Sequence, residues 1–577
     1  MRRRIAVGVD FGTASARALL IDLDSAEELA EAVRDYPHGV VDEALPSTGA
    51  TLPPNWALQD PSDYLPTLVA VVTEALGAAG VDPRDVVGLG IDTTACTIIP
   101  TTAGGVPLCE LPDLEGRPHA YAKLWKHHAA QPHADRINEL ARLHGGLFLD
   151  AYGGKISSEW LFPKALQIFE EDREVFDAAE RLIELQDWIV TRLVGHEVRG
   201  AQVAGYKATY VLDDGGYPGV EFLEDLAPGF SSVLERLGHS WLAPGARAGG
   251  LLDEWADRLG LPVGTPVAVG SMDAQVAVLG CGISTPGEMV LVMGTSVCNL
   301  VLAEDKRHVE GMSGAVRDGV IPGLWAYEAG QPGVGDTFGW FVRTCLPESY
   351  AIAARERGVS AFDHVAELAA ALRPGASGLM ALDWFNGNRS VLVDADLSGL
   401  LVGMTLGTRP EHIYRALVEA AAFGQRMIID TFTRSGVPVD TIVACGGLPR
   451  RSPLLMQVLA DVTGREIHIS TSRNTPALGA ALHAAIAAGP DDRGLASFAE
   501  AAALASVEQS AYVPDRSDRQ TYDELYEIYA HLHAEFGRNP VDVMYALRRI
   551  AAQQRNPEPN GRPARRTRSH PFERTPR

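Results

Sequence analysis

The side chains best suited to phosphate chemistry follow a short apolar run at the start of the chain. Asp10 ends this run, and Gly12 and Thr13 predict a tight turn after it. Such a turn lets backbone N–H groups approach phosphate oxygens, because glycine has no Cβ atom in the way. Arg17 offers a charge-assisted contact to the same phosphates. Because an aspartate repels phosphate unless a cation lies between them, Asp10 also predicts Mg²⁺, held through water. Taken alone, D-x-G occurs widely and is more typical of an ordinary turn.

The same pattern recurs in the second half of the chain. Residues 287–303 contain an apolar run, the turn Gly294-Thr295-Ser296 and a second apolar run. Two such hairpins, one near the start of each half, favour a duplicated fold with a cleft between the copies. The alternative at this point is coincidence between two ordinary hairpins.

Other nucleotide-binding patterns are missing from the sequence. Gly154 and Lys155 come closest to G-x-x-x-x-G-K-[ST], but Leu149 and Ile156 stand where a glycine and a hydroxyl are needed. The patterns G-x-G-x-x-G and H-E-x-x-H do not occur either. A nucleotide would therefore have to be bound through the two hairpins.

Apolar periodicity indicates the elements that must position these turns. A helix is predicted to start at Asp60-Pro61, where an N-cap residue precedes proline. The pattern also predicts a buried strand within 86–100, helices at 157–171 and 178–193, and strand signals over 266–280. Residues 440–464 are predicted to form a strand, a turn at Gly446-Gly447 and then a helix. Residues 475–489 are predicted to form a helix of small residues that can pack tightly on a sheet.

Length and composition limit the class of protein. A chain of 577 residues predicts two large domains. A net charge of −24 argues against nucleic-acid binding by the main body, since phosphate backbones need a positive surface. Six scattered cysteines predict reduced thiols in the cytoplasm, without a metal cluster or disulfide framework. The apolar run before Asp10 is too short for a signal peptide, and no run is long enough to span a membrane. The proline- and arginine-rich tail, residues 554–577, is expected to be disordered.

Five segments in a fixed order are more specific than any one of them. They are VGVDFGTASARALLID, SMDAQVAVLGCG, VMGTSVCNLV, EAGQPGVGD and ACGGLPRRSP. Together they resemble the FGGY family of carbohydrate kinases, from about residue 4 to about residue 550. The resemblance implies an α/β fold of two actin-like (RNase H-like) lobes with a catalytic cleft between them. It implies a sugar-binding lobe over 1–283 and an ATP-binding lobe over 284–553.

The resemblance also implies the reaction and the residues that serve it. Segments such as IDTTACTIIP, GGKISSEWLFPK and LDWFNGNRS are similar to those of family members that act on ribulose. They imply phosphorylation of L-ribulose by MgATP, as in L-arabinose breakdown. The preference for one enantiomer or for pentitols stays open. The choice between monomer and homodimer stays open as well. Asp273 would be the catalytic base. The first phosphate loop would comprise Asp10, Gly12, Thr13 and Arg17, and the second would comprise Gly294 and Thr295. Gly446 and Gly447 would lie against the adenosine. The residues in contact with the sugar would be Thr94, Ala95, Trp125, Lys207, Asp273 and Glu328.

Plainer interpretations exist for several of these residues. Without the family context, Asp273 would be a loop or capping aspartate, Lys207 a solvated lysine and Trp125 a core aromatic. We expect Trp160 and Trp188 in the core. His127 and His128 are expected at the polar surface, without a role.

Three other functions remain open on the sequence. The first is a related kinase for xylulose, glycerol, gluconate or ribitol. The second, from a different class, is an ATP-switched binding or filament protein of the actin and Hsp70 type, although the residues after 480 offer no peptide-binding or polymerising unit. The third is a kinase-like transcriptional regulator, which would need a helix-turn-helix for which the N-terminus leaves no room.

Overall fold

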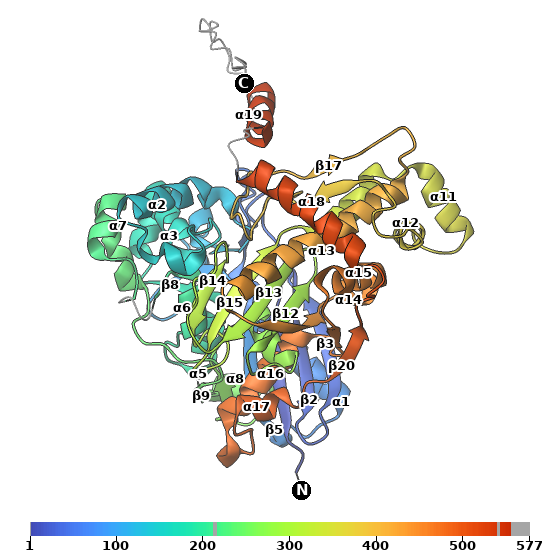
Figure 1. The fold of residues 1–577 in the computed structure, drawn as a ribbon. Helices are drawn as coiled ribbons and strands as arrows, with labels where there is room; N and C mark the ends of the chain where they lie inside the picture. The colour runs from blue at the N-terminus through green and yellow to red at the C-terminus, as the bar shows by residue number, and fades with distance from the viewer. Residues whose placement is uncertain (1, 212–215, 539–542, 556–577) are drawn as a thin grey trace, which may run out of the picture.

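The computed structural model of the chain describes residues 2–211, 216–538 and 543–555 (Figure 1). Most of the predicted disordered tail, residues 556–577, lies outside these ranges. Its first two residues end helix α19 (Val543–Arg555), so the tail was predicted to begin slightly too early. Within the described part of the chain, no helix combines the length and apolar character that a membrane crossing requires.

Two seven-stranded sheets form the centre of the molecule. We call the part built on the first sheet the N-terminal lobe and the part built on the second sheet the C-terminal lobe. The first runs in the order β3 (Glu27–Asp35), β2 (Ser15–Asp22), β1 (Ile5–Phe11), β5 (Val86–Thr93), β10 (Pro266–Ala268), β9 (Arg247–Gly250), with β11 (Ser271–Met272) paired to β5. The second runs in the order β14 (Gly314–Arg317), β15 (Trp325–Gln331), β13 (Val297–Ala303), β12 (Gly287–Met293), β18 (Val439–Cys445), β19 (Ile467–Ser470), β20 (Val507–Tyr512).

The two sheets repeat one topology. In the first, β1 pairs antiparallel with β2 and parallel with β5, while β3 continues antiparallel beside β2. In the second, β12 pairs antiparallel with β13 and parallel with β18, while β15 continues antiparallel beside β13. The duplication that the two glycine hairpins predict is therefore confirmed, and coincidence is excluded.

Two helices lie between the sheets and join the lobes. Helix α9 (Asp273–Gly280) packs on β12 and β13. Helix α16 (Thr475–Ala488), labelled in Figure 1, packs on β1 and β5. The approach is close because glycines line it: a Cβ atom on Gly90 would lie 2.0 Å from the Ala480 carbonyl oxygen. A Cβ atom on Gly479 would likewise lie 2.1 Å from the Val276 carbonyl oxygen. The prediction that 475–489 forms a helix packed tightly on a sheet is confirmed.

Further elements surround each sheet. The N-terminal lobe adds a four-stranded sheet, and α2, α3 and α7 gather on one side of the molecule, with α11 and α12 on the other (Figure 1). The bounds are β4 (Leu58–Gln59), α1 (Tyr64–Ala79), β6 (Ile98–Thr101), β7 (Ala122–Lys123), α2 (Gln131–Leu143), α3 (Leu161–Glu171), α4 (Arg173–Ala178), β8 (Arg181–Glu184), α5 (Leu185–Val194), α6 (Ala201–Lys207), α7 (Val220–Leu226) and α8 (Asp253–Leu259). In the C-terminal lobe they are α10 (Val334–Trp340), α11 (Glu348–Glu356), α12 (Ala361–Ala370), β16 (Met380–Leu382), β17 (Leu400–Val402), α13 (Pro410–Arg434), α14 (Leu448–Arg451), α15 (Pro453–Thr463), α17 (Phe498–Ala502) and α18 (Arg519–Gly537).

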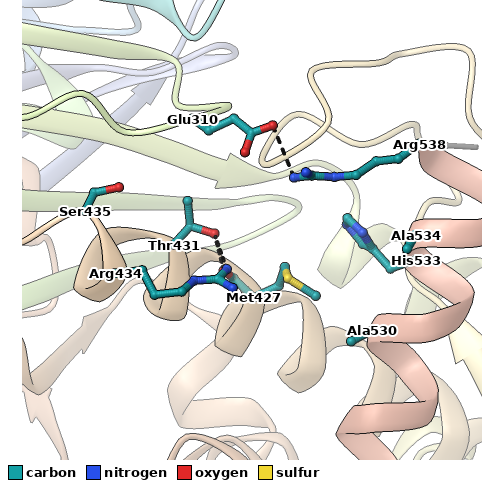
Figure 2. A pocket seen from close by; sticks show the side chains of 9 residues that line it. All are labelled: Glu310, Met427, Thr431, Arg434, Ser435, Ala530, His533, Ala534 and Arg538. Atoms are coloured by element: carbon teal, nitrogen blue, oxygen red, sulfur yellow. Dashed lines mark hydrogen bonds and ion pairs between the residues drawn. The ribbon is translucent and has the colours of Figure 1, made fainter.

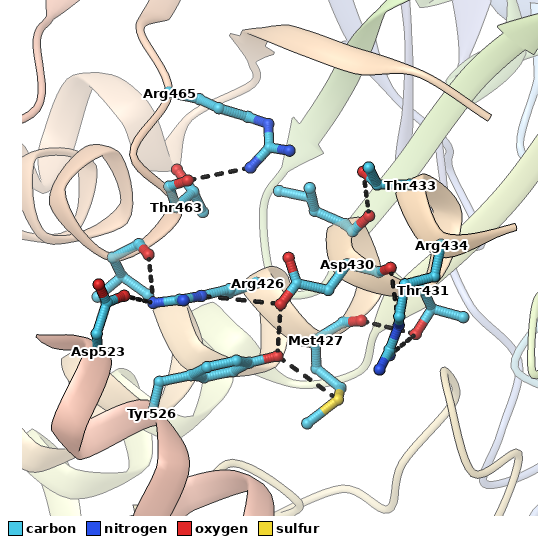
Figure 3. A network of polar contacts seen from close by, with 12 residues as sticks. Arg426, Met427, Asp430, Thr431, Thr433, Arg434, Thr463, Arg465, Asp523 and Tyr526 are labelled. Atoms are coloured by element: carbon cyan, nitrogen blue, oxygen red, sulfur yellow. Dashed lines mark hydrogen bonds and ion pairs between the residues drawn. The ribbon is translucent and has the colours of Figure 1, made fainter. Parts of the chain in front are cut away.

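A polar network holds the long helix α13 against α18 (Figure 3). Arg426 of α13 pairs with Asp523 of α18 at 2.7 Å. The hydroxyl of Tyr526 donates to Asp430 at 3.0 Å, and the guanidinium of Arg426 lies 4.1 Å from the centre of the Tyr526 ring. These contacts fix α18 on the outer surface of the C-terminal lobe.

Two predicted elements differ in the structure. Residues 178–193 were expected to form one helix, but residues 181–184 form strand β8, which pairs with β6, and only α5 is helical. Residues 266–280 showed strand signals throughout, yet residues 273–280 form α9. Buried valine and leucine suit both structures, so in each case the neighbouring sheet decides between them.

Candidate active site

Three aspartates come together where β1, β5 and β11 end. Asp10 and Asp92 stand opposite each other in the parallel β1–β5 register, and Ser271, two residues before Asp273, stands opposite Asp92. Asp92 is fully buried, and neither of its carboxyl oxygens makes a hydrogen bond within the described part of the chain. Burial raises the pKa of Asp92 well above its usual value, and the charges of Asp10 and Asp273 add to this effect. The site therefore begins with a group of carboxyls that repel one another.

The first predicted phosphate turn is held from several sides. The Gly12 amide donates to the Ser15 carbonyl at 2.9 Å, so this N–H is already used. Tyr36 donates to the Gly12 carbonyl at 3.0 Å, and Gln59 donates to the Thr13 carbonyl at 2.8 Å. Trp125, predicted at the sugar, donates its indole N–H to the Thr13 hydroxyl at 3.1 Å. Both carbonyls are fixed, which keeps the turn in one shape.

Arg17 faces a carboxylate in this structure. Its Nη1 donates to Asp10 Oδ2 at 3.0 Å, and the Asn474 side chain donates to the same oxygen at 3.4 Å. Arg17 was predicted to contact a phosphate directly. That contact stays a prediction, and in this structure the guanidinium pairs with the aspartate that was predicted to attract Mg²⁺.

The second predicted turn lies at the ends of two neighbouring strands. The Gly294 amide donates to the Ser296 carbonyl at 2.8 Å, and the Thr295 carbonyl accepts from the Gly335 amide at 3.0 Å. Gly446, at a φ of +90°, follows β18 so closely that a Cβ atom would lie 2.4 Å from the Met293 carbonyl oxygen. The structure therefore brings Gly294, Thr295 and Gly446 together. Cβ atoms on Gly294 and Gly447 would meet nothing within 4 Å, so there is open space beside both.

Asp273 is the first residue of α9 and is exposed in part. The Ala274 amide donates to its Oδ1 at 2.7 Å. Burial, and next the charge of Asp10, raise the pKa of Asp273 from 3.8 to about 7. A carboxyl with this pKa is ionised in half the molecules at neutral pH and is suited to proton transfer there.

A buried ion pair joins the lobes beside Asp273. Lys207, the last residue of α6, places its ammonium 3.0 Å from both carboxyl oxygens of Glu328 on β15. Gln275 donates to the same carboxylate at 2.7 Å. Burial lowers the pKa of Lys207, but the charge of Glu328, the nearby Cys96 and the hydrogen bond to Glu328 together outweigh burial and raise the pKa above its usual value. Both residues were predicted at the sugar, and the structure shows that they contact each other.

The other predicted sugar-pocket residues follow β5. Thr94 is buried, and its amide donates to the Phe11 carbonyl at 3.0 Å. Ala95 is partly buried and packs against a hydrophobic cluster of the N-terminal lobe and against a second cluster formed by residues of both lobes. The expected core positions of Trp160 and Trp188 are confirmed. The expectation for His127 was wrong: its ring is fully buried, accepts the Ala57 amide hydrogen and pairs with Gln167.

Sequence reasoning missed three polar residues of this region. Asp92 could have been found, because it ends a strand as Asp10 does. Gln275 follows Asp273 by two residues and had no signal of its own. Arg389 belongs to the quoted segment LDWFNGNRS, but sequence reasoning assigned this arginine no role, and its contact with Gly330 is seen only in the structure.

Two open cavities lie away from these residues. One, of about 390 Å³, is lined by Glu310 and by residues of α13 and α18, among them His533 (Figure 2). The other, of about 580 Å³, is lined in part by Trp56 and His128. Neither contains a predicted site residue. In the described part of the chain no group of three or more His, Cys, Asp or Glu is placed to hold a metal by itself, and all six cysteines, which lie there, are unpaired.

Comparison with known proteins agrees with the geometry. The models of the FGGY family of carbohydrate kinases match residues 5–280 (N-terminal domain) and 289–488 (C-terminal domain). The chain is 49% identical over 550 residues to a ribulokinase of Anoxybacillus flavithermus, covering 95% of this chain and 97% of the relative. It is also 49% identical over 553 residues to a ribulokinase of Shouchella clausii, covering 96% and 98%. A crystal structure of xylulose kinase from Rhodospirillum rubrum superposes with a TM-score of 0.75 at 24% identity, covering 92% of this chain and 98% of that one. The predicted fold, two actin-like α/β lobes, is confirmed.

Proposed function

The chain belongs to the FGGY family of carbohydrate kinases and is a phosphotransferase that uses ATP, and from this premise we propose that its acceptor is ribulose. The observation that carries the proposal is near-full-length identity of 49% to two proteins named ribulokinase. The polar pair Lys207–Glu328 beside Asp273 supports it, because a polyol needs donors and acceptors at fixed positions. We assign residues 1–283 to a sugar-binding lobe and 284–553 to an ATP-binding lobe.

We assign the nucleotide to the two glycine turns. The open space beside Gly294 and Gly447 would admit phosphate and adenosine, which a Cβ atom would obstruct. Asp10 is our candidate for Mg²⁺, through water. Mg²⁺ in such sites is usually held by one or two carboxylates together with substrate phosphates, so a single aspartate can serve. The ion would offset negative charge on the phosphates.

The residues of this chain then divide the chemistry between them. The Asp273 carboxylate accepts the proton of the sugar's terminal hydroxyl as that oxygen bonds to the γ-phosphorus, and ADP leaves as the old P–O bond breaks. Lys207 and Glu328 orient the acceptor. Backbone N–H groups near Thr13 and Thr295, with Arg17, offset charge on the phosphates. The scattered unpaired cysteines agree with our proposal that the enzyme works in the cytoplasm.

The test is ADP release by the purified protein with a set of acceptors. We expect kcat/KM for ribulose to exceed those for xylulose, glycerol and gluconate. Both enantiomers of ribulose are included in the set. A clear preference for xylulose would refute the substrate assignment while keeping the reaction class. ATP hydrolysis without dependence on any sugar would instead favour an actin- or Hsp70-type switch.

A further inference from the structure

Two neighbouring strands of the four-stranded sheet hold Thr13 of the first phosphate turn. Strand β4 pairs antiparallel with β7, so that Gln59 stands opposite Ala122. Gln59 donates to the Thr13 carbonyl at 2.8 Å, and Trp125, which follows β7, donates its indole N–H to the Thr13 hydroxyl at 3.1 Å. The backbone and the side chain of one turn residue are therefore held from the same sheet.

The backbone contact does not depend on Trp125. The hydroxyl of Tyr64 donates to Gln59 Oε1 at 2.5 Å, which leaves the Nε2 group of Gln59 to donate to the Thr13 carbonyl. Tyr64 and Gln59 are both buried, and burial raises the pKa of Tyr64 well above its usual value, so its hydroxyl stays a donor. The bond from Trp125 therefore serves the Thr13 side chain alone.

The chain that carries the indole is anchored in the core of the N-terminal lobe. The Leu124 carbonyl accepts from the ammonium of Lys164 at 2.7 Å, and the Leu124 amide donates to the Ala57 carbonyl at 3.0 Å. Lys164 is fully buried, and the same ammonium donates to the Cys96 carbonyl at 2.5 Å. The residue before Trp125 is therefore held through both of its backbone polar groups.

The direction of the bond between Trp125 and Thr13 decides what the hydroxyl can do. An indole N–H only donates, whereas a hydroxyl has one hydrogen to donate and two lone pairs that accept. The Thr13 oxygen is therefore the acceptor in this bond, and its own hydrogen is available to another acceptor. Thr13 is partly exposed. A phosphate oxygen carries negative charge and only accepts, so it would be a strong partner for this hydrogen.

We propose that Trp125 is a positioning residue for the nucleotide, because its N–H group holds the Thr13 side chain in the rotamer whose hydroxyl donates to a terminal phosphate oxygen of ATP. Without the indole N–H, the Thr13 side chain can turn about its Cα–Cβ bond, and the hydroxyl is no longer set toward the phosphate. Trp125 was predicted only at the sugar, and this role is separate from that one. The inference rests on the proposed function, since it concerns the nucleotide that the kinase uses.

The experiment measures binding of the nonhydrolysable analogue AMP-PNP with Mg²⁺ by titration calorimetry, in the absence of sugar. Trp125→Phe removes the N–H group and keeps an aromatic ring. We expect its Kd for AMP-PNP to rise about 3- to 10-fold, the size of one neutral hydrogen bond, while KM for ribulose changes less than about twofold. Trp125→Leu also lacks the N–H group and replaces the phenylalanine variant if that variant does not fold.

Two controls separate positioning from a loss of stability. Trp188→Phe also removes one indole hydrogen bond, to the Gly105 carbonyl at 2.8 Å, which is not part of the turn, and it should keep the wild-type Kd within about twofold. Thr13→Val removes the hydroxyl itself at nearly the same size. In the Thr13→Val background, Trp125→Phe should change the Kd by less than about twofold, because the group through which it acts is gone.

An unchanged Kd in Trp125→Phe, or an equal rise in Trp188→Phe, would overturn the proposal. So would the same rise with and without the Thr13 hydroxyl, since the indole would then act by another route. A wild type that neither binds AMP-PNP nor releases ADP with ribulose refutes the proposed function and this inference together. A wild type that does both, with a Trp125→Phe variant that binds AMP-PNP as tightly, refutes this inference alone.

Discussion

The raised pKa of Asp273 predicts a specific pH dependence of the reaction. An ordinary aspartate, with a pKa of 3.8, would be ionised throughout the range from pH 6 to pH 8. Burial and the charge of Asp10 raise the pKa of Asp273 to about 7. Because a general base acts only in its deprotonated form, activity must be lost as the pH falls through this value.

The size of the effect follows from this pKa. About nine-tenths of the molecules carry an ionised Asp273 at pH 8 and about one-tenth at pH 6, so kcat/KM for ribulose should fall about tenfold between these values. The slope below pH 6 should approach one decade per pH unit. With an ordinary aspartate as the base, the same interval would show almost no change.

The assay is initial ADP release at low ribulose concentration, saturating ATP and excess Mg²⁺, at constant ionic strength from pH 5.5 to 8.5. Asp82→Asn serves as the control, because Asp82 is an exposed carboxyl whose pKa is held at about 2 by Arg84. Its profile should match that of the wild type. A flat wild-type profile, or a midpoint below pH 5, would refute the assignment of Asp273 as the base with this environment.

Two further predictions concern how the lobes are held together. Gly90→Ala should lower the free energy of unfolding by about 3 kcal/mol or more, because its Cβ atom would lie 2.0 Å from the Ala480 carbonyl oxygen. The matched variant Gly77→Ala on α1 places a Cβ atom where nothing lies within 4 Å, and it should raise the free energy of unfolding by about 0.5–1 kcal/mol. Equal urea midpoints for the two variants would contradict the packing of α16. Lys207→Met should lower the free energy of unfolding by about 3 kcal/mol, because it leaves the Glu328 carboxylate buried without its cation. An unchanged thermal midpoint would mean that the pair does not stabilise the contact between the lobes.

The sequence was most informative where local chemistry decides the structure. The two hairpins could be predicted because glycine, threonine and alternating apolar residues specify a turn between strands, and both appear as β1–β2 and β12–β13. The segment 178–193 was less predictable. Leu182 and Ile183 fit a helical stripe as well as a strand, and the neighbouring β6 selects the strand.

The sequence suggested candidate site residues one by one but not how they are arranged. Lys207 and Glu328 are 121 positions apart, and no periodic pattern connects such distant residues. The pairing of Arg17 with Asp10 was likewise missed, because an arginine in a phosphate loop and one that neutralises an aspartate have the same sequence signature. Arg389 approaches β15 from an irregular segment, where spacing carries no information on what lies nearby.

The most direct test of the account is the turnover of Asp273→Asn, which keeps the size of the side chain and removes the base. We predict that kcat with ribulose and MgATP falls by at least about 10²-fold while KM for ribulose changes only a few-fold, because base catalysis contributes about 10²–10⁴ in rate and the sugar keeps its other contacts. Near-normal turnover by the folded variant would contradict the proposal that this carboxylate takes the proton during phosphoryl transfer.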